Sequence, residues 1–214
     1  MADIQDAERE ELEAIKKWWK ENGRVATIGL ILGLGGVFGW SWWEAQTIAK
    51  EERASELYEQ LVNWAAARNA SQVNEIAGTL MQEYPKSGYA PLSGLIRASS
   101  AFNENQPDEA QAYLQWVVDN TDRADLQAIA KMRIARLVAD RGDPDAALAQ
   151  LDGVDVATLG ASLSELRGDL LEAKGDNEGA AAAYNEALAD EAVSPTMRRR
   201  LELKLDDLGV GGAL

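Results

Sequence analysis

The sequence contains neither cysteine nor histidine. Without cysteine the chain can form no disulfide, offers no thiol nucleophile and cannot carry a lipid on a cysteine. Without histidine it lacks the most common general base and metal ligand of neutral solutions. These two absences disfavour an enzyme, and we expect no catalytic residue, no cofactor and no metal ion.

Basic residues are scarce as well, with 21 lysines and arginines against 36 acidic residues and a net charge of −15. Residues 1–43 hold 7 of the acids and 5 of the bases, so the remainder of the chain keeps a net charge of −13. An acidic surface repels nucleic acid, which we therefore exclude as a partner. The one basic cluster, at 198–200, is too short for a nucleic-acid footprint, and we expect it to pair with the chain's own acids.

One stretch lacks charge altogether: residues 25–43 read VATIGLILGLGGVFGWSWW. As a helix this run is long enough to cross the hydrocarbon of a bilayer, and its strongly apolar residues contribute about −4 kcal/mol of insertion free energy. Tryptophans flank it as an interfacial aromatic belt would, namely Trp18, Trp19, Trp40, Trp42 and Trp43. The sequence predicts a transmembrane helix over 25–43; a buried helix in a soluble core is the alternative.

The flanks of this run predict its orientation. Lys16, Lys17, Lys20 and Arg24 crowd its N-terminal side. By the positive-inside rule, residues 1–24 are a cytoplasmic tail and residues 44–214 are exported. A signal peptide cleaved near residues 47–49 is the alternative, but the acid-rich leader and the bulky tryptophans disfavour it.

Glycines inside the run form two GxxxG pairs, Gly29 with Gly33 and Gly35 with Gly39. The missing side chains allow a neighbouring membrane helix to approach closely. Glycine is also common in membrane helices that bind no partner, so helix packing and a plain anchor both remain open.

Both sides of the run carry helical periodicity. Residues 5–22 are expected to form a short amphipathic helix, followed by a break or a loosened turn at Asn22-Gly23; a solvated stub without a role beyond topology is the alternative. After the run, an apolar stripe resumes at Leu57, Leu61, Trp64 and Ala65. It predicts a helix that either continues the run or is joined to it by a short hinge, with Trp64 in the core.

Four helix breaks then recur at similar intervals, at 69–72, 105–110, 142–148 and 175–181, which stand 36, 37 and 33 residues apart. In each break a glycine or asparagine can take the left-handed conformation that ends a helix. Side chains that could cap the following helix are Ser71, Asp143 and Asp176. Prolines suited to a first helical turn are Pro107, Pro144 and Pro195.

A period near 34 residues, built from two antiparallel helices, is typical of tetratricopeptide repeats. No strand pattern competes. The fold predicted is all-α: an N-terminal transmembrane helix followed by a tetratricopeptide-like helical solenoid of about four helix pairs, closed by a helix at 195–208. Such a solenoid offers a concave surface to extended peptides or partner helices.

Trp116 is the candidate partner contact on this solenoid. It lies at the edge of the apolar stripe that contains Tyr113 and Val117. An edge tryptophan can anchor an interface or simply cover the core, and both interpretations stay open.

Several motifs resemble the YfgM-type family, the ancillary subunits of the bacterial Sec translocon. They are KWWKENG at 17–23, GLILG at 29–33, MRIARL at 132–137, LRGDLLEAKGD at 166–176 and LKLDDL at 203–208. The resemblance covers nearly the whole chain in order and is weakest over 46–84. It implies a bacterial inner-membrane protein with a single span and a periplasmic tetratricopeptide-like domain.

The same resemblance implies partners and a role. Members of this family associate with the SecYEG channel and with PpiD, a periplasmic chaperone, and help to pass emerging secretory proteins to chaperones. The expected partners are therefore SecYEG, a PpiD-like chaperone, secretory client proteins and the lipid around one span. A scaffold for another envelope complex, such as division or outer-membrane assembly, and an enzyme with an unusual carboxylate site are the alternatives.

Overall fold

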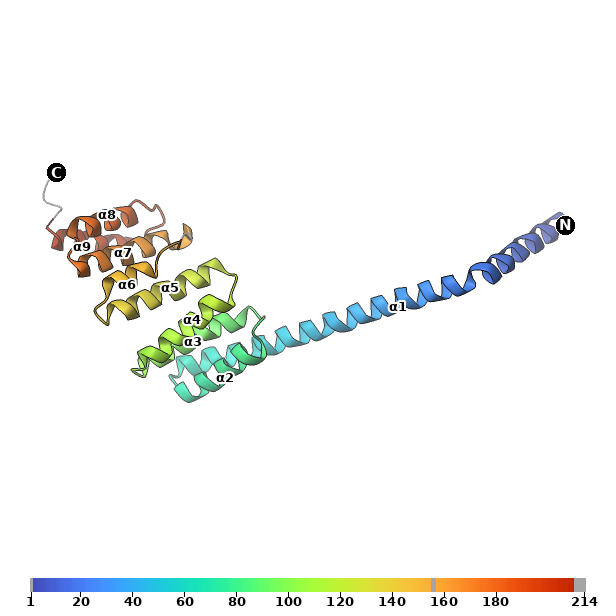
Figure 1. The fold of residues 1–214 in the computed structure, drawn as a ribbon, viewed down its shortest axis with the longest axis horizontal. Coiled ribbons are helices and arrows are strands. Elements are labelled where there is room, and N and C mark those ends of the chain that lie inside the picture. The colour runs from blue at the N-terminus through green and yellow to red at the C-terminus, as the bar shows by residue number, and fades with distance from the viewer. Residues whose placement is uncertain (1, 155–156, 210–214) are drawn as a thin grey trace. The chain divides into compact units, whose positions relative to one another are not determined.

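The computed structural model of this protein describes residues 2–154 and 157–209, and every regular element in these ranges is helical (Figure 1). The elements are α1 (Ala2–Ala66), α2 (Ala70–Glu83), α3 (Tyr89–Asn103), α4 (Pro107–Asn120), α5 (Ala124–Ala139), α6 (Pro144–Ala149), the 3-10 helix η1 (Ala157–Leu159), α7 (Gly160–Lys174), α8 (Asn177–Leu188) and α9 (Pro195–Asp207). The chain divides into two compact units, Met1–Arg53 and Ala54–Leu214, which we call the first and the second unit. The predicted all-α class is confirmed for the described residues.

In the first unit, helix α1 runs through the expected break at Asn22-Gly23, so that prediction is wrong. The Asn22 side-chain amide donates to the carbonyl oxygen of Trp18 at 3.3 Å, and the Thr27 hydroxyl donates to that of Gly23 at 2.7 Å. Both bonds span four residues, as the helix's own ladder does. One glycine inside a helix costs only about 1 kcal/mol relative to alanine, too little to end it here.

Large apolar side chains lie exposed along this unit. The tryptophans Trp18, Trp19, Trp40, Trp42 and Trp43 are 53–69% exposed. Ile28, Leu34 and Val37 are exposed to a similar extent. Among the described residues, no helix combines the length and the apolar character needed to cross a membrane.

The second unit consists of helix pairs, as the repeat spacing predicts. In residues 54–154 and 157–209, the end of α1 shares a buried cluster with α2, and α3 pairs with α4, α5 with α6 and α7 with α8; α9 follows as the closing helix. The turns inside these pairs fall at the four predicted breaks. The third pair is irregular, because α6 has only six residues and η1 intervenes before α7.

Capping follows the predicted chemistry in three of the four pairs. The carboxylates of Asp143 and Asp176 each accept a backbone N–H three residues on, at 2.9 Å, and prolines begin α4, α6 and α9. The first break differs. Asn69, not Ser71, caps α2, and Arg68 takes the left-handed conformation with φ 54°. Asn69 is three residues before the Gln72 N–H that needs an acceptor, whereas Ser71 already lies inside the helix.

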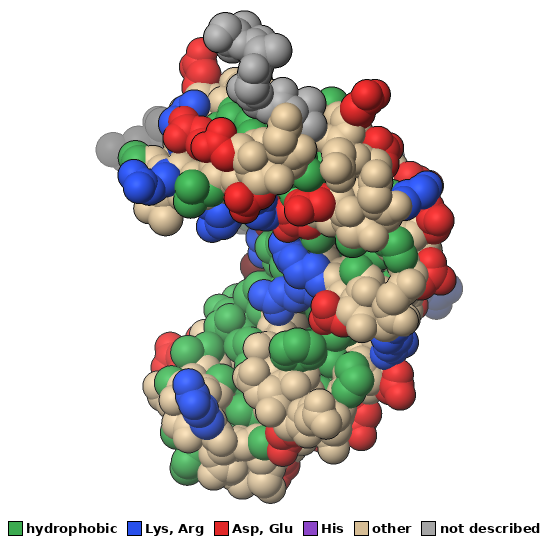
Figure 2. Space-filling model, turned by 90° about the vertical axis from the view of Figure 1, so that its left-hand side faces the viewer, with side chains coloured by type: hydrophobic (Ala, Val, Ile, Leu, Met, Phe, Trp, Pro, Cys, Tyr) green, Lys and Arg blue, Asp and Glu red, His purple; other side chains and the backbone are tan. Residues whose placement is uncertain are grey.

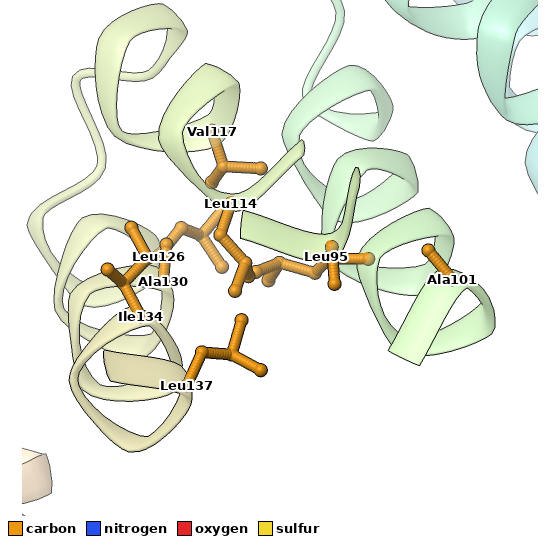
Figure 3. Close-up of a cluster of buried hydrophobic side chains, with 10 residues drawn as sticks. Leu95, Ala101, Leu114, Val117, Leu126, Ala130, Ile134 and Leu137 are labelled. Atoms are coloured by element: carbon orange, nitrogen blue, oxygen red, sulfur yellow. The ribbon is translucent and has the colours of Figure 1, made fainter. Parts of the chain in front are cut away.

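The core of this unit is divided among successive helix pairs. Figure 3 shows one cluster, to which Leu95 and Ala101 of α3, Leu114 and Val117 of α4, and Ile134 and Leu137 of α5 belong. Helices α7 and α8 approach each other closely at Gly168, where an added Cβ would lie 2.3 Å from the Tyr184 ring. The repeats therefore bury their apolar residues between neighbouring helices.

Trp64 departs from the predicted core. Ala54 and Leu61 are fully buried, and Leu57 and Ala65 pack against the same cluster, but Trp64 is 39% exposed. At 100° per residue, the buried stripe passes from Leu61 to Ala65 and leaves Trp64 at its edge. The expectation that Trp64 lies in the core is wrong.

Candidate interaction groove

The first helices of successive pairs line two connected hollows in the second unit. One hollow, of about 450 Å³, lies among α3, α4, α5 and α7. The other, of about 670 Å³, lies among the end of α1, α2, α3 and α5. Ser99 and Arg133 line both hollows, which therefore form one groove across the four helix pairs. We call this surface the groove.

Helix periodicity presents one face of α5 to the groove. Its buried residues pack on both sides: Ala130 and Ile134 join the cluster with α3 and α4, and Met132 and Ala135 join the cluster with α6 and α7. The remaining face carries Arg133, Arg136 and Asp140, spaced by three and four residues. Because α5 is packed on both flanks, its charged residues are held at fixed places in the groove.

Two arginines give the groove its charge. The guanidinium of Arg133 donates to the carbonyl oxygen of Leu95 at 3.2 Å, which fixes it against α3. Burial among the groove walls lowers the pKa of Arg133, and the neighbouring charge of Arg136 lowers it further. Within the part of the chain that the structure describes, no carboxylate forms an ion pair with either arginine, whereas Arg123, Arg141 and Arg200 each have one.

Apolar side chains line much of the first hollow. Phe102 is 52% exposed there, and Leu137, Leu166 and Leu170, which line the same hollow, are buried. Figure 2 shows the hollow of this unit with basic and hydrophobic side chains inside and acidic side chains along the outer edge. The groove is thus more basic and more apolar than the acidic chain around it.

A network of ion pairs joins α9 to α7 at the C-terminal end of the second unit. Arg200 of α9 donates to both carboxylate oxygens of Glu165 on α7, at 2.6 and 2.7 Å. Lys204 contacts Glu165 at 3.0 Å and also Asp169, which together with Glu172 hydrogen-bonds the Tyr184 hydroxyl. The Arg200 guanidinium, with Lys204, lowers the pKa of Glu165, and burial beside the two carboxylates raises the pKa of Tyr184.

This network confirms for Arg200 the expectation that the basic cluster pairs with acids of the same chain. It holds α9 against α7 and uses Asp169, which also lines the groove. Among the side chains that the structure describes, no group of three or more acidic residues is arranged to hold a metal ion.

Trp116 lies outside the groove lining. It is half-buried on α4 against the cluster shared by α3, α4 and α5, and its ring carbon Cε3 lies 3.5 Å from the place where a Gly94 Cβ would stand. This position favours a role in covering the core. Its role as a partner contact stays a prediction.

The predicted packing glycines all lie on α1. A Cβ added at Gly29, Gly33 or Gly39 would meet nothing within 4 Å, so these positions present open backbone. The surroundings of Gly35 lie outside the described residues. Helix packing through the two pairs remains a prediction.

The sequence-based predictions missed the groove residues Ser99, Phe102, Arg133 and Arg136. One signal was available, because Arg133 has no acidic residue three or four positions away on its own helix. That pattern does not exclude an acid on another helix. Only the packing of α3, α5 and α7 shows that none pairs with Arg133 in the described residues.

Comparisons with known proteins agree with this architecture. The family model of the tetratricopeptide repeat-like domain matches residues 16–210. A protein of Escherichia coli K12 named "Ancillary SecYEG translocon subunit" is 29% identical over 97% of this chain and 100% of its own length. Proteins of the same name from Aggregatibacter actinomycetemcomitans and Neisseria gonorrhoeae are 31% and 29% identical, each over 94% of this chain and 97% of the relative. The chain therefore belongs to the tetratricopeptide repeat-like family that includes these ancillary SecYEG translocon subunits.

Proposed function

We propose that this protein is a non-enzymatic scaffold at the SecYEG translocon, anchored in the bacterial inner membrane. The observation that carries the proposal is the match along nearly the full chain to relatives named as ancillary SecYEG translocon subunits. The match includes both the uncharged run and the repeat region, so it extends beyond a shared repeat fold.

Residues 25–43 serve as the membrane anchor in this proposal. They are free of charge and helical, and tryptophans at both of their ends are exposed. By the positive-inside rule, the basic residues that precede them favour a cytoplasmic position for residues 1–24 and a periplasmic position for residues 44–214. The open backbone at Gly29 and Gly33 would allow a helix of the channel to pack closely against this span.

The groove is the surface that serves the scaffold function. Its walls come from first helices of successive pairs, which suits an extended segment of a PpiD-like chaperone or of an emerging secretory protein. The exposed Phe102 offers a contact to such a segment, as do Arg133 and Arg136, which form no ion pair with any described residue. The protein then acts by holding partners near one another, and it needs neither catalytic residue nor cofactor.

Site-specific photo-cross-linking in intact cells tests this proposal. A photoreactive residue replaces Val37 in the anchor or Ser99 in the groove of the full-length chain, and Gln115 on the exposed side of α4 serves as control. We expect Val37 to capture a SecYEG subunit, Ser99 to capture a chaperone or client, and Gln115 to capture neither. Capture of a division or outer-membrane assembly protein without any Sec subunit would replace this function by the other scaffold role.

A further inference from the structure

We propose that the groove selects an extended polypeptide segment in which an acidic side chain stands close to a large apolar side chain. The acidic group contacts Arg133 and Arg136, and the apolar group packs on Phe102. This inference rests on the proposed scaffold function, because it specifies the chemistry of the segment that the scaffold holds.

The two arginines of the first hollow support an acidic ligand. Asp140 and Asp169 line it together with Arg133 and Arg136. Asp169 is already engaged by Lys204 and by the Tyr184 hydroxyl, so Asp140 alone faces two arginines. The formal charges of the lining balance, but neither arginine forms an ion pair among the described residues, so a ligand carboxylate can satisfy guanidinium donors that no side chain there pairs with.

The apolar part of the ligand follows from Phe102. This side chain is 52% exposed inside a hollow that buried leucines also line. A large apolar side chain that packs on Phe102 removes both surfaces from water. It also shields the nearby arginines from solvent, which strengthens their contact with a carboxylate.

The continuity of the groove indicates a side-chain carboxylate rather than a chain terminus. Arg133 stands where the two hollows meet, with space on both sides. A segment can therefore run past Arg133 in both directions. Beyond it, the second hollow is lined by Ser99, Ser100 and Asn103, whose side chains suit the polar backbone of an extended segment.

Selection from a random dodecapeptide library tests the inference on the full-length protein in detergent. The expected result for the parent is enrichment of peptides with aspartate or glutamate near leucine, phenylalanine or isoleucine. The double variant Arg133→Gln/Arg136→Gln should lose the acidic preference and bind a selected peptide about tenfold more weakly, since a charge-assisted contact is lost. Phe102→Ser should lose the apolar preference and keep the acidic one.

Arg123→Gln/Arg141→Gln is the matched control, because it removes the same charge from α5 and its flanks outside the groove lining. This control should select the same peptides as the parent. Circular dichroism checks that each variant remains folded. Enrichment of basic or purely apolar peptides, no enrichment at all, or equal loss in the control variant would overturn the inference. Binding to anionic vesicles is measured on the same variants. The inference is also overturned if replacing the groove arginines weakens vesicle binding and leaves peptide binding unchanged.

Co-purification of SecYEG subunits is measured on the same variants. Acidic selection without Sec capture by the parent would leave the groove chemistry standing and reject the proposed function. If the parent captures Sec subunits but shows no acidic selection, the proposed function stands and the groove chemistry is rejected.

Discussion

Many large apolar side chains are buried in the second unit of this protein, whereas those described in the first unit are exposed. In the second unit, leucines such as Leu61, Leu166 and Leu170 are buried between helices of the same chain. In the first unit, side chains such as Leu34 and Trp40 are 49% and 69% exposed on a helix with no second helix of that unit to cover it. Helical periodicity alone does not separate these cases. The difference is whether the same unit supplies a second helix that covers the apolar side chains.

The largest effect is expected from a charge inside the second unit. Leu170→Asp should lower the free energy of unfolding by about 4 kcal/mol or more, because an unpaired carboxylate is buried between α5 and α7. Folded domains hold only about 5–15 kcal/mol in total. Thermal unfolding of the fragment 46–214, which we expect to be soluble and helical, measures the change. Leu203→Asp on α9 is the control, since Leu203 is 55% exposed, and equal melting of both variants would contradict the core assignment.

The same type of change in the first unit should break membrane attachment and leave folding intact. Leu34→Arg places a charge at the middle of the uncharged run, which costs about 3 kcal/mol of insertion free energy and cancels most of the run's preference for lipid. Carbonate extraction of membranes measures the loss. Leu12→Arg, outside the run, serves as control because Leu12 is exposed on the same helix. Unchanged attachment of the Leu34 variant would refute the anchor.

Trp116 tests whether the second unit also has a partner contact away from the groove. If it anchors an interface, Trp116→Ala should weaken capture of a chaperone or client by about 1–3 kcal/mol. If it covers the core, the variant should melt at a lower temperature and still capture its partners once folded. Cross-linked yield and thermal unfolding, measured on the same preparation, distinguish the two outcomes.

The glycines of α1 test whether the first unit packs against another helix in addition to serving as an anchor. Gly29→Leu/Gly33→Leu should weaken association with SecYEG by about 1–2 kcal/mol, since bulky side chains prevent close helix packing. The repeats should remain folded, because a side chain at either position meets nothing within 4 Å. Co-purification of channel subunits gives the readout. If the variant co-purifies channel subunits at the same yield as the parent, the span is only an anchor.

The smallest effect is expected at the ion pair between α7 and α9. The pKa of Glu165 is lowered in the folded state by Arg200 and Lys204, so its contribution to stability is present above the ordinary carboxylate pKa of 4.5 and is lost as the pH falls through the lowered value. Arg200→Gln should cost at most about 1 kcal/mol at pH 7, because Arg200 is half exposed. Unfolding measured from pH 7 to pH 3 should show the difference from the parent shrinking in acid.

Local signals predicted much of the second unit. Asp143 and Asp176 mark helix starts because a capping carboxylate acts three residues along the same chain. Prolines at the starts of α4, α6 and α9 have an equally local reason, the absent donor in the first turn. At the first break the predicted cap was Ser71, whereas the observed cap is Asn69, two residues earlier.

The sequence by itself determined that the second unit consists of paired helices, because caps, breaks and apolar stripes depend on residues within a few positions of one another. Tertiary structure alone decided which charges remain unpaired. Arg200 meets Glu165 across 35 residues of sequence, whereas Arg133 faces the groove from a helix packed on both flanks. An ion pair depends on distances between helices, and those distances are fixed only when the repeats stack.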